Sequence, residues 1–168
     1  MRMQAFDIAG GSVGGGDLGS YMALRQAVPK PVSEDRHARH IQRFYACRGL
    51  RRAGYPELFV LPDVTAGDRR FHPDVVGRRG DGLEFVYCAA HSLDEVPIDE
   101  IRTLTAEAGP MIMLVVANVL DVDGLSADLA DLVASGRVSV RTMTLPPFDD
   151  VLEYDIWMFE LTFQEAVR

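Results

Sequence analysis

The sequence predicts an α/β protein in which a mixed central β-sheet is flanked by helices. Short runs rich in Val and aromatic residues occupy much of residues 58–90, and helix-patterned and strand-like segments alternate after residue 92. Closely spaced strands favour antiparallel pairing, whereas strands separated by helices favour parallel crossovers. The 168 residues, of which 48% are hydrophobic, suffice for one globular domain.

The first 32 residues differ from the rest of the chain. Residues 10–20, GGSVGGGDLGS, contain six glycines. Glycine at this density opposes a packed helix or strand. We therefore predict a glycine-rich N-terminal arm at residues 1–32 and a single α/β domain at residues 33–168.

The domain is predicted to begin with a basic helix over residues 33–54. Ser33 suits the N-cap, acidic residues follow it, and Gly54 suits the stop. The expected buried face consists of Ile41, Phe44, Tyr45 and Leu50. The expected exposed basic surface, which would bind nucleic acid or a protein partner, consists of Arg36, Arg39, Arg43, Arg51 and Arg52.

The later elements are predicted in the order strand, strand, strand, helix, strand, helix, strand. The strands are expected at residues 58–63, 71–77, 83–90, 111–119 and 138–145. The first of these helices is expected to start near Pro97 and to stop at Gly109, and the second is expected to occupy residues 124–136. The inward positions would be Ile98, Ile101, Leu104 and Thr105 in the first helix, and Leu125, Leu129, Leu132 and Val133 in the second. The tail at residues 148–168 is apolar enough to close one edge of the body.

Charge is distributed unevenly along the chain, whose net charge is −8. Residues 1–82 contain 13 basic and 9 acidic residues, whereas residues 83–168 contain 4 and 16. This pattern disfavours wholesale nucleic-acid wrapping but allows a local basic face, an acidic protein partner or self-association. The chain shows no apolar run of membrane-span length and no signal peptide, so a cytoplasmic protein that does not bind membranes is expected.

The two cysteines, Cys47 and Cys88, have a spacing that signals neither a disulfide framework nor a zinc site. Both are predicted to be buried free thiols. A nucleophile and base formed by Cys88 and His91 is the alternative. It is disfavoured because Cys88 is expected to point into the sheet.

The hairpin at residues 69–90, RRFHPDVVGRRGDGLEFVYCAA, contains the candidate catalytic residues. Asp74 precedes one strand, and Glu84 opens its partner after a polar turn. Two carboxylates held a few ångströms apart can bind Mg²⁺, which polarises a phosphate and activates water. A basic residue two positions after the Glu would share its face of the strand, because side chains alternate with period two. That position is Val86.

The hairpin and the order of elements resemble the PD-(D/E)XK nuclease, or restriction-endonuclease-like, superfamily. Pro73 and Asp74 are similar to its Pro-Asp, and LEFVYC is similar to its hydrophobic strand carrying Glu-x-Lys. The resemblance covers residues 33–145 and implies an α-β-β-β-α-β core. In an active nuclease of this kind, Asp74 and Glu84 would bind Mg²⁺ and act on DNA or RNA, with an acidic residue such as Glu34 beside them and Arg39 or Arg43 on the phosphate.

The lysine of this motif is missing in either alignment of the second strand. If Glu84 takes the Glu position of the motif, its Lys position falls on Val86. If the downstream dipeptide Ser92-Leu93 sets the alignment instead, the Glu and Lys positions fall on Val86 and Cys88. Valine can neither bind a metal nor assist a water. We therefore predict a non-catalytic binding or assembly module without a cofactor. The alternative is a divergent Mg²⁺-dependent nuclease that uses Asp74 and Glu84.

Overall fold

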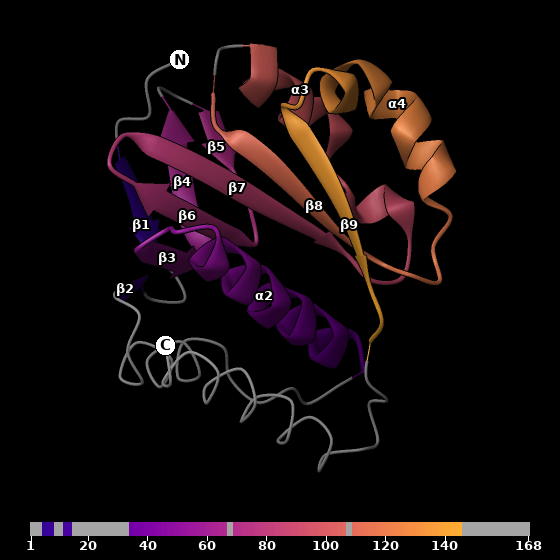
Figure 1. The fold of residues 1–168 in the computed structure, drawn as a ribbon, viewed down its shortest axis with the longest axis horizontal. Helices are drawn as coiled ribbons and strands as arrows, with labels where there is room; N and C mark the ends of the chain where they lie inside the picture. Colours follow the sequence, from indigo (N-terminus) through magenta and orange to yellow (C-terminus); the bar gives the residue numbers. More distant parts are fainter. Residues whose placement is uncertain (1–4, 9–11, 15–33, 67–68, 107–108, 146–168) are drawn as a thin grey trace.

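The computed structural model describes residues 5–8, 12–14, 34–66, 69–106 and 109–145 (Figure 1). Within these ranges the chain forms helices on both faces of a mixed sheet, as predicted for the α/β class. The helices are α2 (Glu34–Arg52), the 3₁₀ helix η1 (Leu93–Glu95), α3 (Ile98–Ala106) and α4 (Val122–Ala134). The strands are β1 (Ala5–Ile8), β2 (Ser12–Gly14), β3 (Glu57–Val60), β4 (Pro62–Ala66), β5 (Arg69–Phe71), β6 (Val75–Arg79), β7 (Gly82–Ala89), β8 (Met111–Ala117) and β9 (Val138–Met143).

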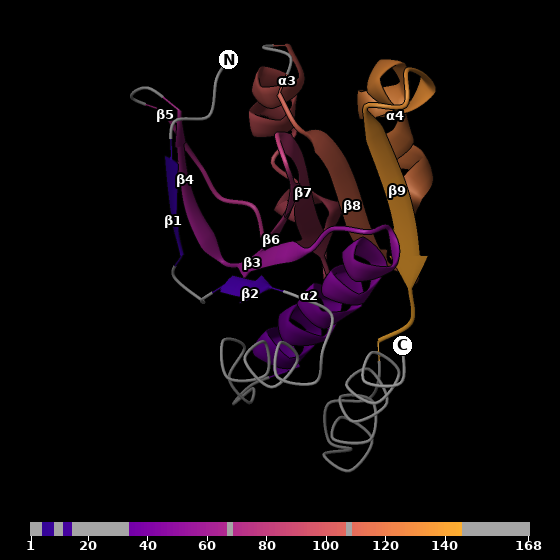
Figure 2. The same cartoon turned by 60° about the vertical axis from the view of Figure 1, so that its left-hand side comes forward.

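The central sheet has six described strands in the order β2-β3-β6-β7-β8-β9, and a smaller sheet has the order β1-β4-β5. Strands β3, β6 and β7 are antiparallel neighbours, whereas β7, β8 and β9 are parallel. The parallel connections pass through α3 and α4, which lie on the face of the sheet opposite α2 (Figure 2). The prediction of antiparallel strands followed by crossovers is confirmed.

Alternation along the strands separates the apolar side chains into two cores, one on each face of the sheet. The core beneath α2 includes Val75, Val86, Cys88 and Val115. The core beneath α3 and α4 includes Val76, Phe85, Tyr87 and Leu114. Because β7 and β8 are covered on both faces, both contain nearly continuous buried runs.

Two predicted strands are each divided between the two sheets. β3 ends at Val60, and the chain enters the smaller sheet at Pro62. Leu61, between them, has φ 52°, a left-handed conformation that is uncommon for a residue with a side chain. Residues 71–77 divide similarly between β5 and β6. The run at residues 58–63 looks continuous in the sequence, because its break at Leu61 depends on the backbone conformation, which composition does not specify.

The hairpin turn between β6 and β7 is shorter than expected. Residues 80–81 alone form the turn, with Gly80 at φ 57°. Arg78 and Arg79, expected in the turn, are the last residues of β6. Arg78 makes two hydrogen bonds of 2.7 Å to the carboxylate of Glu57 on the neighbouring strand. This ion pair joins the side chains of the last residue pair in the β3–β6 ladder.

The predicted helix ends agree well with the structure. Gly54 follows α2 with φ 93°, and its N–H donates to the carbonyl of Arg51. Gly109 follows α3, and its N–H donates to the carbonyl of Leu104. The expected inward residues of α3 are buried or half-buried: Ile98, Ile101, Leu104 and Thr105.

The inward face of α4 agrees only in part. Leu125 and Leu129 are buried and Leu132 is half-buried, but Val133 is 37% exposed. The prediction for Val133 is wrong because the helix is kinked at Leu129, whose φ and ψ of −121° and 15° are not helical. The kink changes the direction of the last turn, which a uniform helical period does not anticipate.

Two short strands fall within the predicted N-terminal arm. Ser12–Gly14 pairs with β3, and Ala5–Ile8 pairs with β4. The expectation that dense glycine opposes a strand is therefore wrong at Ser12–Gly14, because backbone pairing to a sheet edge needs no side chain. The tail at residues 148–168 and the N-cap candidate Ser33 lie outside the described residues. None of the described helices combines the length and apolar character needed to cross a membrane.

Candidate functional site

The carboxylate of Asp74 is bound from two directions at the entrance to β6. Its Oδ1 accepts a hydrogen bond of 3.1 Å from Nε of Arg43 on α2, and its Oδ2 accepts one of 2.9 Å from the backbone N–H of Cys88 on β7. The N–H of Asp74 itself donates to the carbonyl of Val86 at 2.8 Å. Asp74 therefore links the central helix to the hairpin.

The ion pair between Asp74 and Arg43 is largely removed from water. Their side chains are only 13% and 9% exposed. A charge in such a place is costly unless it is paired and hydrogen-bonded, so each group depends on the other. The prediction that Arg43 lies on an exposed basic surface is wrong, because its side chain is directed beneath α2 to this carboxylate.

The β7 residues that contact Asp74 do not complete a metal site. Val86 has no ligand atom, and burial, followed by the charge of Asp74, raises the pKa of Cys88 well above its usual value. Mg²⁺ prefers several oxygen ligands, and here one carboxylate is already engaged by a guanidinium. Among the side chains that the structure describes, no group of three or more His, Cys, Asp or Glu could hold a metal ion.

Glu84 lies near the start of β7, whereas Cys88, whose N–H binds Asp74, lies near its end. Glu84 pairs with Gly77 across the hairpin. Burial, followed by the charge and hydrogen bond of Glu84, raises the pKa of Tyr55, which locates this carboxylate beside that phenol. Glu84 and Cys88 are four residues apart, or about 13 Å at about 3.3 Å per residue. The structure therefore does not bring Asp74 and Glu84 together.

Arg51 is a second arginine for which the predicted exposure is wrong. It is only 9% exposed, and its Nη1 donates to the carbonyl of Pro56 at 3.0 Å. Helix α2 buries side chains well beyond a single apolar stripe, so positions assigned to its outer face are also covered. Arg52 is exposed as expected, and the side chain of Arg36, like that of Glu34, lies outside the described residues.

Arg39 joins α2 to the turn that follows β7. Its Nη2 contacts Oε1 of Glu95 at 2.7 Å. The other oxygen of Glu95 accepts N–H hydrogen bonds from Ala90, His91 and Ser92 at 3.1, 2.7 and 2.7 Å. Burial acts to raise the pKa of Glu95, but these hydrogen bonds and the charge of Arg39 outweigh it, so the pKa is lowered. Arg39 is thus part of a structural contact.

Gln42 is a buried polar residue that the sequence analysis did not identify. Its side chain is fully buried, and Nε2 donates to the carbonyls of Ala89 at 2.8 Å and Val115 at 3.3 Å. It therefore bridges α2 to β7 and β8. A single Gln among arginines on a helix resembles a surface residue, so the sequence carries no signal for this role.

The two cysteines are buried and free, as predicted. Burial raises the pKa of Cys47 to about 12. Since the pKa of Cys88 is raised as well, both thiols stay protonated near neutral pH. His91 is exposed, whereas Cys88 points into the core beneath α2. This arrangement argues against a nucleophile and base formed by Cys88 and His91.

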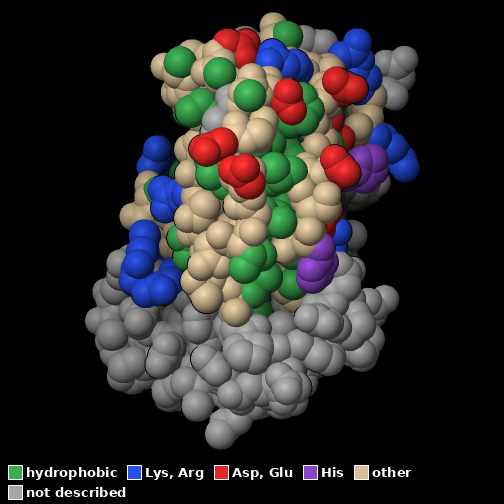
Figure 3. Space-filling view, turned by 90° about the vertical axis from the view of Figure 1, so that its right-hand side faces the viewer, with side chains coloured by type: hydrophobic (Ala, Val, Ile, Leu, Met, Phe, Trp, Pro, Cys, Tyr) green, Lys and Arg blue, Asp and Glu red, His purple; other side chains and the backbone are tan. Residues whose placement is uncertain are grey.

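A cavity of about 580 Å³ lies between the N-terminal parts of α3 and α4. Its lining combines apolar side chains with four acidic residues: Asp94, Asp99, Glu100 and Asp128. Figure 3, which views the molecule from the α4 side, shows acidic side chains among hydrophobic ones over the upper part of this face. Three of these acidic residues lie in the first turns of η1 and α3, where a negative charge interacts favourably with the helix dipole. Their presence is therefore explained by the helices themselves.

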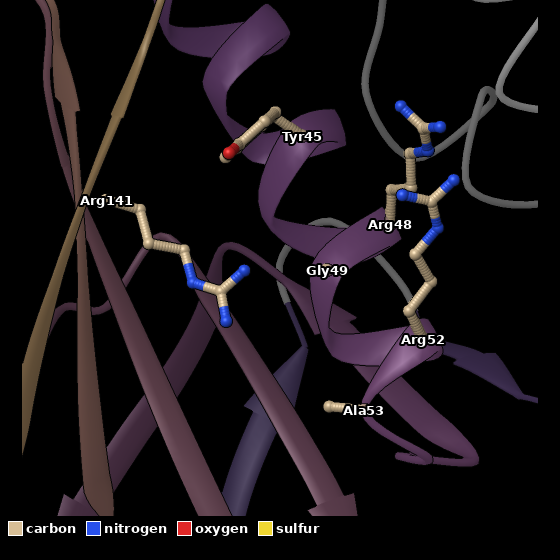
Figure 4. Close-up of a pocket in the computed structure, with 6 residues that line it drawn as sticks. All are labelled: Tyr45, Arg48, Gly49, Arg52, Ala53 and Arg141. Atoms are coloured by element: carbon tan, nitrogen blue, oxygen red, sulfur yellow. The ribbon is translucent and has the colours of Figure 1, made fainter.

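A smaller cavity of about 280 Å³ lies between the end of α2 and β9 (Figure 4). Its lining residues are Tyr45, Arg48, Gly49, Arg52, Ala53 and Arg141. Of the predicted binding arginines whose side chains the structure describes, Arg52 alone lines it. Arg48 and Arg141 were not identified, although helical spacing from Arg52 could have indicated Arg48; the approach of Arg141 depends on the tertiary fold.

Comparison of the chain with protein-family profiles, with curated proteins and with solved structures finds no match. The resemblance of the hairpin to the PD-(D/E)XK superfamily therefore stays a prediction.

Proposed function

We propose that the chain is a non-catalytic binding or assembly module built on a scaffold similar to that of PD-(D/E)XK nucleases. The order α2, β3, β6, β7, α3, β8 supports this, because it corresponds to the α-β-β-β-α-β order that the resemblance implies. Strands β4 and β5 form an insertion between the first two strands of that order. Proteins that share a scaffold can differ in activity, so the function depends on the residues around Asp74.

The pairing of Asp74 with Arg43 is the observation that carries the proposal. In a metal-dependent nuclease this carboxylate would bind the metal. Here a guanidinium and a backbone N–H bind its two oxygens, and the pair is mostly buried. The ion pair between Asp74 and Arg43 would thus occupy the position of a metal site and hold α2 against the hairpin.

The surroundings of Asp74 support the alignment in which Val86 and Cys88 take the Glu and Lys positions of the motif. Asp74 contacts the backbone of both residues, whereas Glu84 lies toward the other end of β7. In that alignment the second carboxylate and the lysine are both absent. The Mg²⁺-dependent nuclease would need Asp74 and Glu84 to meet on one ion.

Cleavage assays test the proposal. The purified chain is incubated with supercoiled DNA, single-stranded DNA and RNA in millimolar Mg²⁺ or Mn²⁺, beside Asp74→Ala and Glu84→Ala. We expect no product beyond that of the Asp74→Ala protein. Cleavage that Asp74→Ala abolishes in a protein shown by circular dichroism to be folded would refute the proposal and establish the nuclease alternative.

A further inference from the structure

Strand β9 forms one edge of the six-stranded sheet. Within the part of the chain that the structure describes, β8 is the strand that pairs with it, in parallel register. Figure 2 shows β9 at the opposite margin of this sheet from β2 and β3. Ser139, Arg141 and Thr142 are exposed and Val140 is half-buried, so solvent reaches this edge. An exposed strand edge is a template for pairing with a further strand.

The pairing of β9 with β8 determines which of its backbone groups point outward. The carbonyls of Arg137 and Met143, at the two ends of the strand, accept hydrogen bonds from N–H groups on the β8 side. Because the backbone groups of successive residues alternate between the two sides of a strand, those of Val138, Val140 and Thr142 point away from β8. Each of these three residues therefore offers one donor and one acceptor to another strand.

Helix α4 presents an uncharged side next to the same edge. On this helix, which packs over β9, Asp128 lines the cavity shared with α3, and Asp131 pairs with Arg102 of α3. By the helical period, Ala130 and Val133 lie away from these acidic residues, on the side of α4 beside the outer edge of β9. Ala130 is exposed, and Val133 is 37% exposed. The strand edge is thus continued by an apolar strip on the helix.

We propose that two copies of the chain join antiparallel at β9, which continues the sheet across a two-fold axis. The proposal rests on the proposed assembly role and deepens it by naming a second copy of the chain as the partner. Since Val140 is the middle one of the three outward residues, the axis passes beside it. Val140 then lies opposite Val140 of the second copy, and Val138 lies opposite Thr142. Each of these pairs exchanges two backbone hydrogen bonds.

The side chains suit this register. Val140 pairs with its own copy, and β-branched side chains pack well across paired strands. On the other face of the sheet, Arg141 lies opposite Ser139, so no two arginines are directly opposed. The two α4 helices meet above the axis through Ala130 and Val133, whose apolar surfaces leave water together. A second copy therefore complements both the strand and the helix, as a two-fold interface requires.

Disulfide cross-linking tests this register in the full chain. Val140→Cys places two thiols beside the axis, at a Cα separation of about 5.5 Å that a disulfide can span. Thr142→Cys is the matched control at an exposed position, because its two thiols would lie four residues apart along the strands, or about 13 Å. Cys47 and Cys88 are buried and do not compete. We expect oxidation with copper phenanthroline to link most of the Val140→Cys protein, and little of the Thr142→Cys protein, into dimers.

Light scattering after gel filtration measures the association itself. We expect a dimer whose dissociation constant rises about tenfold or more in Val133→Glu, because two like charges then approach each other across the axis. Ala127→Glu is the charge control, since Ala127 is exposed on α4 but lies outside the apolar strip. It should leave the dissociation constant within about twofold of its original value.

A chain that stays monomeric at about 0.1 mM, where a dimer of micromolar affinity is nearly complete, would overturn the proposal, whichever other segment or protein pairs with the edge. A dimer in which Val140→Cys cross-links no better than Thr142→Cys would overturn the register. Equal weakening by Val133→Glu and Ala127→Glu would overturn the role of the helix strip. These outcomes are independent of the cleavage assays: a monomer would remove self-assembly without restoring a nuclease, and cleavage that depends on Asp74 would leave the edge untouched.

Discussion

Replacement of Asp74 by alanine should strongly destabilise the protein. The change removes the partner of Arg43, whose side chain is 9% exposed, and also the acceptor of the Cys88 N–H. Removing one member of a buried ion pair costs about 3–5 kcal/mol, and the partial exposure of Asp74 favours the lower end, about 3 kcal/mol. For a urea dependence of about 1.5 kcal/mol per M, the unfolding midpoint should fall by about 2 M.

Urea unfolding followed by circular dichroism measures this loss, and a double-mutant cycle assigns it to the pair. Arg43→Met keeps the apolar stem of the side chain but removes the charge. The combination of Arg43→Met with Asp74→Ala should be less destabilised than the sum of the single variants by about 2 kcal/mol, since neither charge is left unpaired. Asp128→Ala, an exposed carboxylate on α4, should change stability by less than about 0.5 kcal/mol. Equal or greater stability of Asp74→Ala relative to the unchanged protein would contradict a stabilising role of the ion pair, because that is the behaviour of a carboxylate retained for catalysis at the expense of stability.

Three further predictions concern Glu95, Gly77 and the two cysteines. The pKa of Glu95 is lowered in the folded protein, so its ionised form stabilises the fold at pH values above 4.5, the ordinary pKa of this side chain. This stabilisation is lost as the pH falls through the folded pKa. Glu95→Gln should therefore be less stable than the unchanged protein at pH 7, with a difference that shrinks below pH 4.5; a difference independent of pH would contradict the charge argument. Gly77→Ala should cost about 1–3 kcal/mol in urea unfolding, because the new Cβ would lie 3.1 Å from the ring of Tyr55, and an unchanged midpoint would argue against this close packing. Cys47 and Cys88 should react with a thiol reagent such as DTNB only slowly in the folded protein and fully after unfolding, and rapid labelling of the native state would contradict their burial.

Sequence reasoning predicted the order of the main elements because their signals are local. Gly54 and Gly109 mark the ends of helices, and the inward face of α3 follows the helical period. The break at Leu61 was not predictable in this way, since its left-handed backbone has no marker such as glycine. The change of direction within α4 at Leu129 is likewise set by packing rather than by composition.

Two residues of the candidate site were named from the sequence, but the contact between them was not. Asp74 was identified from the hairpin, and Arg43 was identified as a basic residue of the first helix. Their ion pair depends on how α2 crosses the sheet, which one sequence does not specify. The same limit explains why Arg141 was missed: it lies far along the chain from the helix whose pocket it lines.

Metal titration tests most directly whether the ion pair between Asp74 and Arg43 has replaced a metal site. Mn²⁺ binding is followed by electron paramagnetic resonance of the free ion in the unchanged protein, Asp74→Ala and Glu84→Ala. We predict the same titration curve for all three folded proteins. Stoichiometric Mn²⁺ binding that is lost in folded Asp74→Ala would contradict it.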